Sequence, residues 1–537
     1  MIKNKILPVI ALLLSFQFIS FAQVNLSKDF KVSVSDPFAV IDGASKEYFS
    51  DGKGFAIAVK TNGEKAFIQR FNVSTMKEVN RNEYEDFPPY NKVQKIMQVG
   101  DRLYYIFSSF DKKAKVENIY SREINMADAS FQKAKLLFST SSEVTVSSYV
   151  DNIPGTFGAG GIRFEVLTSF DNSKIMIRYR TKPQVKKDSK NFDVLGFYVF
   201  DAGFTKVWGG EAKMPYTEKE MNNLAYSVTK DGKAFMLAYL NETKAFELFA
   251  INKDLSVKKS KMDIDGKLFF QEFKLRESAD GNISCTGYYA NGLDVKVNWT
   301  GNAALSFNTN GILHFKMDQE GKILEKYDYE FPIALINQFE STRAQDKNEK
   351  REGEGKAGIN DVKMTNLIQN ADGSTIIVGE QQYIRNEFVG TKQQIVYHYG
   401  HVIMTKIDKN GKLLWMNKLP KNQAGVVGKG GMGIRFIKSA DAEYVLFLDN
   451  IKNANLSKDE APAKHMDGRG GYLTAFKVND GTGAFEKHYL FDIEDINGQQ
   501  AYQFKTPRIF DSSDKTFLLE VYLKGKKDGI VKMELLK

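Results

Sequence analysis

Short strand-forming runs recur along this chain, each directly after a tight turn. Residues 55–59 read Phe-Ala-Ile-Ala-Val, and residues 103–107 read Leu-Tyr-Tyr-Ile-Phe. Asp-Gly and Asp-Asn pairs tolerate the positive φ angles of tight hairpins, and β-branched or alternating apolar flanks favour strands. Eight such turns occur, at Asp51-Gly52, Gly100-Asp101, Asp171-Asn172, Asp231-Gly232, Asp280-Gly281, Asp372-Gly373, Asp441-Ala442 and Asp514-Lys515. The pattern therefore predicts an all-β chain built from a repeated hairpin.

A second kind of turn follows about half a repeat after the first. It occurs seven times, at residues 72–74, 128–130, 201–203, 252–254, 318–321, 408–411 and 479–481. The last repeat ends with the run 529–535 and so has three strands instead of four. The isolated run 30–34 near the N-terminus supplies a fourth strand, which predicts a ring closed by pairing both ends of the chain.

These repeats resemble those of the β-propeller superfamily. Residues 407–415, which end in Trp415, are similar to the outer hairpin of secreted bacterial propeller repeats. The resemblance implies one propeller of eight four-stranded blades over residues 23–537, whose last blade is closed by the N-terminal strand. Seven blades, or two stacked β-domains, are the alternatives. WD, kelch and sialidase Asp-box signatures are missing, and no specific functional family is indicated.

Long connections fall on one predicted face of the ring. In a four-stranded blade the first and third turns lie on one face, where every turn here is tight, and the other connections lie opposite. The long segments all belong to the second set, at 139–161, 181–192, 291–310, 337–360, 381–400, 421–433 and 450–471. Long loops without a role are uncommon, so this face is the expected functional surface. Neutral drift in loop length is the alternative.

Six residues on this face are binding candidates. Arg163 and Arg435 follow similar glycine-rich segments, at 155–161 and 425–433, and a pair of guanidinium groups suits a carboxylate, sulfate or phosphate. Each arginine could instead pair with an acidic neighbour such as Glu165. Trp299, Tyr383, Tyr397 and Tyr399, together with Phe388, are expected to form an aromatic wall near a ligand.

The N-terminus reads as a secretory signal. Lys3 and Lys5 precede an apolar stretch, and small residues before Gln23 fit a cleavage site, so residues 1–22 are an expected signal peptide. A retained membrane anchor is the alternative, but the stretch is short for a span, and no later segment is long enough. The mature protein is therefore expected in the periplasm or at the cell surface.

Composition narrows the function only slightly. A formal net charge of +9, two units of which lie in the signal, is mild, and an exported protein seldom meets nucleic acid. The single cysteine, Cys285, lies in an apolar run and reads as a buried hydrophobe. Trp208 and Trp415 are expected to pack between blades.

No catalytic or cofactor pattern stands out. The histidines lack ligand spacing: His398 and His401 are expected on opposite faces of a strand, and no metal or cofactor is predicted. Asp408 to Gly411 fits a turn and lacks the calcium-loop spacing. The mixed-charge run 346–356 reads as a solvated, mobile segment.

These observations favour a monomeric binding or scaffold protein that holds a protein or glycan of the cell envelope. The rival hypothesis is a carbohydrate-active hydrolase or lyase, with carboxylates such as Glu165 and Glu272 at the central channel.

Overall fold

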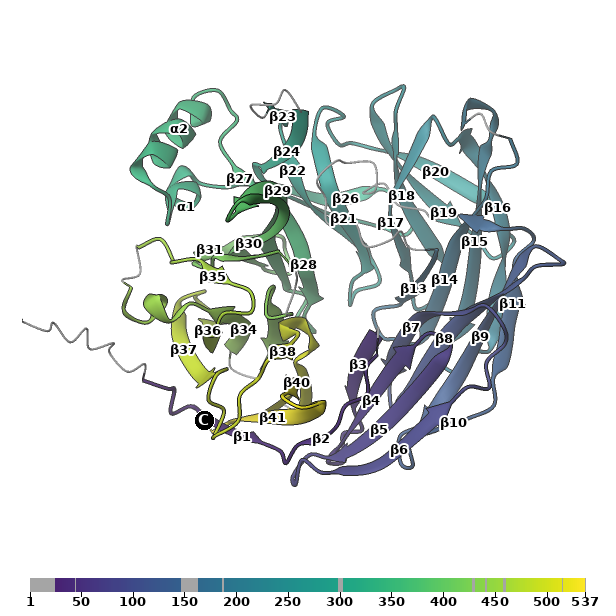
Figure 1. The fold of residues 1–537 in the computed structure, drawn as a ribbon. Coiled ribbons are helices and arrows are strands. Elements are labelled where there is room, and N and C mark those ends of the chain that lie inside the picture. The colour runs from purple at the N-terminus through teal and green to yellow at the C-terminus, as the bar shows by residue number, and fades with distance from the viewer. Residues whose placement is uncertain are drawn as a thin grey trace, which may run out of the picture.

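The chain folds as a β-propeller. The structure is a computed structural model that describes residues 25–43, 45–145, 163–185, 188–297, 303–426, 430–439, 442–456, 460–513 and 515–536. Within these ranges the strands form nine sheets, and eight of the nine have four or more strands. These eight sheets follow one another around a ring, and we number them blades 1 to 8 in chain order (Figure 1). The predicted propeller is confirmed, and the number of these sheets in the described residues agrees with the predicted eight blades.

Blades 1 to 4 consist, in order, of β3 (Ser45–Ser50), β4 (Phe55–Asn62), β5 (Lys65–Asn72) and β6 (Glu78–Tyr84); β7 (Asn91–Val99), β8 (Arg102–Asp111), β9 (Val116–Asn125), β10 (Ser130–Phe131) and β11 (Lys135–Ser139); β12 (Val144–Thr145), β13 (Phe164–Thr168), β14 (Lys174–Thr181), β15 (Phe192–Asp201) and β16 (Lys206–Thr217); and β17 (Met221–Val228), β18 (Ala234–Leu240), β19 (Ala245–Ile251) and β20 (Val257–Met262).

Blades 5 to 8 consist of β21 (Phe269–Glu277), β22 (Ile283–Ala290), β25 (Gly311–Met317) and β26 (Ile323–Glu330); β28 (Val362–Gln369), β29 (Thr375–Val389), β30 (Lys392–Ile407) and β31 (Leu413–Leu419), extended by β32 (Gln423–Gly425) and β35 (His465–Met466); β33 (Arg435–Lys438), β34 (Ala442–Asp449), β36 (Tyr472–Asn479) and β37 (Phe485–Asp492); and β38 (Gln503–Phe504), β39 (Phe510–Ser513), β40 (Thr516–Leu523) and β41 (Lys527–Leu535), joined by β1 (Phe30–Val34) and β2 (Phe38–Ala39).

The remaining elements lie outside the blade strands. They are η2 (Asp188–Lys190), β23 (Leu293–Val297), β24 (Ala303–Thr309), α1 (Ile333–Asn337), α2 (Thr342–Glu352), β27 (Ile359–Asn360), η3 (Ile451–Asn455) and η4 (Thr506–Arg508). No helix of the described ranges is long and apolar enough to cross a membrane.

Local turn chemistry sets the repeat, as the sequence predicts. Six of the eight leading turns have a residue with positive φ, namely Gly52, Gly100, Asn172, Gly232, Gly281 and Gly373. In the second set, one Asp408 oxygen accepts hydrogen bonds from the backbone N–H groups of Asn410 and Lys412, both at 2.8 Å. The carboxylate thus fastens its own turn, which is what Asx-type turns require.

The apolar core is divided among the interfaces between blades. Eight clusters of buried hydrophobic residues occur, and each joins two neighbouring blades. On β4, Ile57 and Val59 pack toward blade 2, whereas Ala56 and Ala58 pack toward blade 8. Because both sides of each sheet are covered, the strands read as continuous apolar runs rather than as strict alternation.

The two ends of the chain meet in blade 8. β1 pairs antiparallel with β41, from Phe30 opposite Leu535 to Val34 opposite Val531, and is its outer strand. β2 then pairs with the other end of β41. The prediction that the N-terminal run completes the last blade is confirmed.

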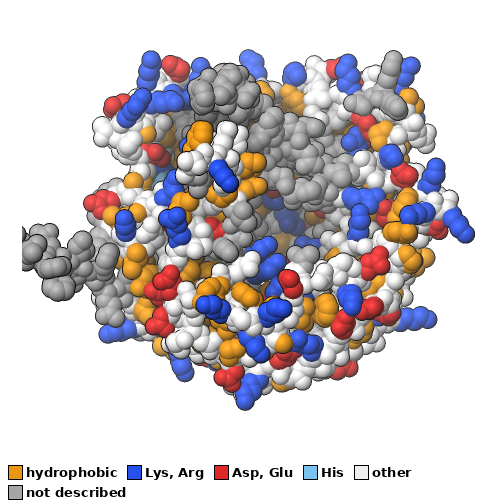
Figure 2. Space-filling model, viewed as in Figure 1, with side chains coloured by type: hydrophobic (Ala, Val, Ile, Leu, Met, Phe, Trp, Pro, Cys, Tyr) orange, Lys and Arg blue, Asp and Glu red, His pale blue; other side chains and the backbone are white. Residues whose placement is uncertain are grey.

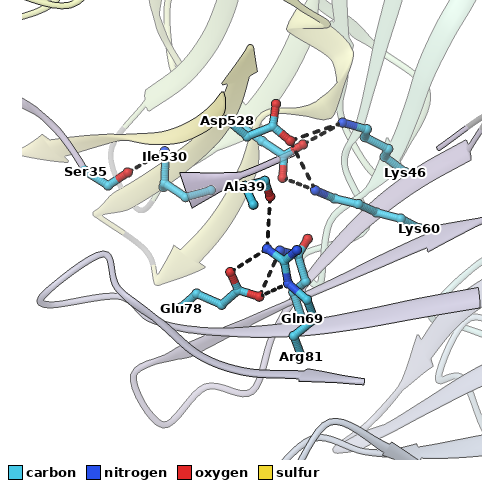
Figure 3. Close-up of polar contacts among 10 residues, drawn as sticks. Ser35, Ala39, Lys46, Lys60, Gln69, Glu78, Arg81, Asp528 and Ile530 are labelled. Carbon is cyan, nitrogen blue, oxygen red and sulfur yellow. Dashed lines mark hydrogen bonds and ion pairs between the residues drawn. The ribbon is translucent and has the colours of Figure 1, made fainter. Parts of the chain in front are cut away.

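A buried ion cluster lies where blade 8 meets blade 1 (Figure 3). Lys60 is fully buried on β4, and its Nζ lies 2.5 Å from Glu520 Oε2 on β40. Lys46 on β3 reaches the other Glu520 oxygen at 2.9 Å, and both ammonium groups lie 3.6 Å from Asp528 Oδ2. Burial raises the pKa of Asp528 to about 6 and lowers the pKa of Lys60.

This ion cluster lies at the interface between two blades that has the smallest hydrophobic cluster in the described chain. The hydrophobic cluster at this closing interface contains six buried residues, fewer than any other interface in the described chain. The N-terminal segment is hydrogen-bonded to both blades: Ile530 N–H donates to Ser35 Oγ at 2.9 Å, and Arg81 Nη2 donates to Ala39 O at 3.0 Å. Charge pairing and the N-terminal segment therefore supplement a thin apolar contact (Figure 3).

The expected interblade tryptophans are confirmed. Trp208 of blade 3 donates its Nε1–H to Gly232 O of blade 4 at 2.7 Å, and Trp415 of blade 6 donates to Asp480 O of blade 7 at 2.9 Å. Each indole thus packs against the next blade and also satisfies one carbonyl of its tight turn. Cys285 is fully buried, as expected for a small core residue.

Two carboxyl groups of blade 7, those of Glu443 and Asp480, influence each other's pKa beside blade 6. Glu443 on β34 is 1% exposed, and burial together with a hydrogen bond to Asp480 raises its pKa to about 8. Lys406 Nζ of blade 6 donates to Asp480 Oδ1 at 2.5 Å. Burial raises the pKa of Asp480, but the hydrogen bonds with Glu443 and Lys406 outweigh this effect and bring the pKa below its ordinary value. At neutral pH the proton therefore resides on Glu443.

We expect Glu443→Gln to become stabilising as the pH rises. A carboxyl whose folded pKa is raised contributes stability that is fully present below its ordinary pKa of 4.5 and is lost as the pH rises through about 8. The amide cannot ionise, so the variant should match the parent near pH 5 and exceed its free energy of unfolding by about 1–3 kcal/mol near pH 9. Urea unfolding at both pH values measures this. Glu486→Gln, where the side chain is 80% exposed, is the control, and an equal pH response of both variants would contradict the assignment.

Candidate functional site

The long connections of blades 5 to 7 assemble into a second layer on one face of the ring. β24 pairs with β27, and the ends of β29 and β30 extend beyond blade 6 as a hairpin. β32 pairs with β30 and, in parallel, with β35 from blade 7. We call these elements, with β23, α1, α2 and η3, the accessory layer. The expected gathering of insertions on one face thus has a structural counterpart in the described chain.

Two segments of this layer differ from the sequence-based expectation. Residues 381–400, expected as a long connection, belong to the continuous hairpin of β29 and β30, which turns near Gly390 at φ +66°. Much of the mixed-charge run 346–356 belongs to α2, which begins after Ser341, whose side chain accepts from Ala344 N–H. The helix has no buried residue, so the segment is solvated as expected. For the same reason its sequence shows no apolar period that would have predicted a helix.

Two buried lysines connect the layer to blade 6. Lys418 Nζ donates to Ile336 O at 3.1 Å and to Gln338 O at 2.7 Å, at the C-terminal end of α1, and also to Glu340 Oε1 at 3.1 Å. A cation at this position satisfies carbonyl groups that the helix leaves unpaired. Burial lowers the pKa of Lys418, and the Glu340 carboxylate opposes that shift.

The second lysine forms an ion pair inside the protein. Lys421 and Glu380 are at most 1% exposed, and Lys421 Nζ donates to Glu380 Oε1 at 2.7 Å and to Tyr399 O at 3.1 Å. The other Glu380 oxygen accepts from Gln382 Nε2 at 2.7 Å. His401 Nδ1 accepts from Lys421 N–H, and burial and nearby lysines hold the pKa of His401 well below its usual value. This imidazole is therefore neutral.

One side of the hairpin tip is stiffened by stacking. The rings of Tyr383 and His398 stack at 4.6 Å with an interplanar angle of 10°, and the Arg385 guanidinium lies 4.6 Å from the centre of the Tyr383 ring. His398 Nε2 lies 2.9 Å from Glu387 Oε1. Cation–π and stacking contacts of this kind restrict side chains on both strands, which fixes the direction of the tip.

The opposite side of the tip presents apolar side chains to solvent. Phe388 is 68% exposed and Ile395 is 52% exposed. The strand register places both on the same side as Tyr397, because Ile384 pairs with Tyr397 and Asn386 pairs with Ile395. An apolar patch on a braced hairpin is a feature of contact surfaces.

The six candidate residues are only partly brought together. Tyr397 and Tyr399 share one side of β30, and Tyr383 lies on the other, so the expected aromatic wall is divided between two sides. Trp299 lies outside the described residues, as do the whole glycine-rich segment 155–161 and residues 427–429 of the segment 425–433.

The two arginines contact acidic residues of neighbouring blades. Arg163 Nη2 lies 2.5 Å from Glu117 Oε1 of blade 2 and donates to Val144 O. Arg435 Nη2 lies 3.7 Å from Asp511 Oδ1 of blade 8, and its Nε makes no hydrogen bond within the described chain. Carboxylate pairing, which the sequence left open as the alternative, is therefore present at both, with partners other than Glu165.

The carboxylates considered for hydrolysis are each paired with a cation. Glu165 on β13 accepts from Arg178 Nε at 2.7 Å, and Glu272 on β21 contacts Lys274. Over the described ranges, no group of three or more His, Cys, Asp or Glu side chains is disposed to hold a metal ion. Sequence reasoning missed Lys418, Lys421 and Glu380, since their partners lie far away along the chain.

Lys and Arg side chains are scattered around the rim in the space-filling view, and the molecule is hollowed near its centre (Figure 2). The charges on this side are mixed rather than of one sign, so no extended single-sign field is evident.

No protein-family model and no curated protein matches this chain. Among solved structures it is similar to the polysaccharide lyase Uly1, at 10% identity over 93% of this chain and 91% of that chain, with a TM-score of 0.38. It is also similar to the WD40 domain of SCAP from fission yeast, at 8% identity over 96% and 98%, with a TM-score of 0.36. A third is the cobalt-substituted apocarotenoid oxygenase ACO of Synechocystis, at 10% identity over 87% and 94%, with a TM-score of 0.36. At such identities the likeness concerns the fold alone.

Proposed function

We propose that this chain is an exported binding protein that holds a protein partner of the cell envelope through its accessory layer. The observation that supports the proposal is the braced hairpin of β29 and β30, with Phe388 and Ile395 exposed on one side. Exposed apolar side chains surrounded by polar ones are the usual centre of a protein interface. A hairpin held in one conformation before binding loses less entropy when the partner arrives. The expected signal peptide supports the exported location in this proposal.

A protein partner fits these observations better than a glycan. Phe388 and Ile395 are exposed and offer apolar contact, whereas the Tyr383 ring is in contact with both His398 and Arg385. The stacked Tyr383 is therefore a poor platform for a sugar, and the exposed pair of an aromatic and an aliphatic side chain favours a protein partner.

Removal of the hairpin tip should abolish partner capture and leave the ring folded. Arg385 and Val396 are directly opposite and form the same type of strand pair as Val389 and Lys392, which flank the native two-residue turn. A two-residue Asn-Gly turn can therefore join them and replace residues 386–395 while the Tyr383–His398 stack is kept. A photo-reactive amino acid at position 388 of the otherwise native chain should cross-link one envelope protein. The same probe at Leu324, which is 48% exposed on the outer strand of blade 5, is the matched control.

The finer test is the double substitution Phe388→Ser with Ile395→Thr. Loss of a central apolar contact of at least about 2 kcal/mol weakens binding about 30-fold, measured as the concentration of chain needed for half-maximal cross-linking of that protein. Capture that survives protease treatment of the extract would point to a glycan instead. Equal capture by the parent and the shortened chain would exclude the hairpin as the binding surface.

A further inference from the structure

The contact between blades 5 and 6 changes character along its length. Toward the accessory layer it is apolar, with Tyr288 and Ile312 of blade 5 against Ile377 and Ile403 of blade 6. Toward the face with the tight turns, the same side of blade 5 becomes polar. Strand register puts these polar residues on one side: Thr286 lies opposite His314, Ser284 opposite Lys316, and Lys316 opposite Glu325.

A cavity of about 410 Å³ occupies this polar half of the interface. Its walls are the tight turns of both blades, at 278–280 and 369–373, together with the blade 5 side chains just described and the turn 408–410. Blade interfaces are normally closed by packed side chains, and a volume of this size is within the range of small-molecule sites. The cavity lies on the face opposite the accessory layer.

His314 presents an open nitrogen to this cavity. The side chain is 7% exposed, and its Nδ1 is hydrogen-bonded to Thr286 Oγ1 at 2.8 Å. Its Nε2 makes no hydrogen bond within the described chain, and the ring lines the cavity. Burial lowers the pKa of His314 to about 4, so the imidazole is neutral near pH 7. The open nitrogen can therefore accept or donate a hydrogen bond to a molecule in the cavity.

The remaining lining combines hydroxyl groups with an excess of negative charge. Four carboxylates face two lysines, and Lys316 is already paired with Asp280. Asp372 and Asp408 each use one oxygen to fasten their own turns. Glu325 makes no hydrogen bond or ion pair within the described chain, so both oxygens of its carboxylate can bond to a ligand. Ser278 and Ser284 add hydroxyl groups, which are hydrogen-bonded to each other at 2.6 Å.

We propose that this cavity binds a small, hydroxyl-rich ligand that carries a positive charge, of which an amino sugar is the chemical type. His314 Nε2 and the serine hydroxyls would form hydrogen bonds with the hydroxyl groups of the ligand, and Glu325 would form an ion pair with its ammonium group. A small cavity lined by both hydrogen-bond donors and acceptors suits a polyol. The unpaired carboxylate favours a polyol that carries a positive charge. The inference is independent of the partner surface on the opposite face.

The test is a titration of the full chain with glucosamine, compared with glucose at the same concentrations. Labelling the histidines with ¹⁵N lets the imidazole signals be followed by NMR, and His314→Phe identifies the His314 signal by its loss. We expect glucosamine to shift the His314 signal, with the other four histidines unchanged. Glucose should require a concentration about tenfold higher, the difference that one charge-assisted contact supplies.

Two matched substitutions on β26 separate site binding from general effects. Glu325→Gln should reduce the preference for glucosamine over glucose to about twofold or less, because the free carboxylate is gone. Glu330→Gln changes the same residue type at the other end of that strand, away from the cavity, and should leave the preference intact. Absence of any His314 shift with either sugar would overturn the proposal. So would a preference that survives Glu325→Gln, or equal affinity for both sugars in the parent.

Discussion

Replacing Lys60 by methionine should destabilise the protein by about 3–5 kcal/mol. Lys60 is fully buried between blades 1 and 8, and its removal leaves Glu520 and Asp528 with Lys46 as their sole remaining cation in the cluster. An uncompensated buried carboxylate is far more costly than the modest net gain of the intact pair. The closing interface also has little apolar area with which to offset the loss. Urea unfolding near pH 7, followed by circular dichroism, measures the change.

Two further variants show whether the buried charge balance is the cause. Asp528→Asn added to Lys60→Met removes one carboxylate and leaves the Lys46–Glu520 pair, so it should recover much of the loss. Lys65→Met makes the same change one strand away, where Lys65 is 48% exposed between Glu83 and Glu85, and should leave the free energy of unfolding close to that of the parent. Similar losses for Lys60→Met and Lys65→Met would show that burial of the cluster does not matter.

Lys421→Met should have an effect of the same size, about 3–5 kcal/mol, concentrated at the base of the accessory layer. The substitution leaves Glu380 buried with Gln382 as its one remaining side-chain hydrogen-bond donor in the described chain, and it also removes the donor to Tyr399 O. Because β32 and the extended hairpin meet at this point, opening should begin there. Limited proteolysis should then cut near residues 421–433 before the blades unfold.

A double substitution tests the pairing itself. Glu380→Gln combined with Lys421→Met removes both charges and keeps an amide that can still bond to Gln382, so its loss should be clearly smaller than that of Lys421→Met alone. Proteolysis of the double variant should return toward the parent pattern. If the two losses simply add, the lysine and the glutamate act independently, and the ion pair is not what holds this region.

The sequence by itself determined the features that rest on local chemistry. Turn residues that tolerate positive φ, followed by apolar runs, indicated the blades, and a surplus strand at 30–34 indicated how the ring closes. Trp208 and Trp415 were predictable as interblade residues for the same reason, since each stands at a fixed distance after a turn. Information of this kind lies within a few residues of the chain.

Only the tertiary structure decided which distant polar groups meet. Lys60 lies in an apolar strand, and its partner Glu520 is 460 residues away, so no local pattern marks the pair. The hairpin at 381–400 lacks a clear apolar alternation because Phe388 and Ile395 lie on its exposed side, and α2 lacks an apolar period because none of its residues is buried. The sequence around His314 does not distinguish a packed residue from a site residue. The structure does, because the facing blade leaves its Nε2 open to the cavity. Those features depend on how two blades are placed against each other, and sequence periodicity carries no record of that placement.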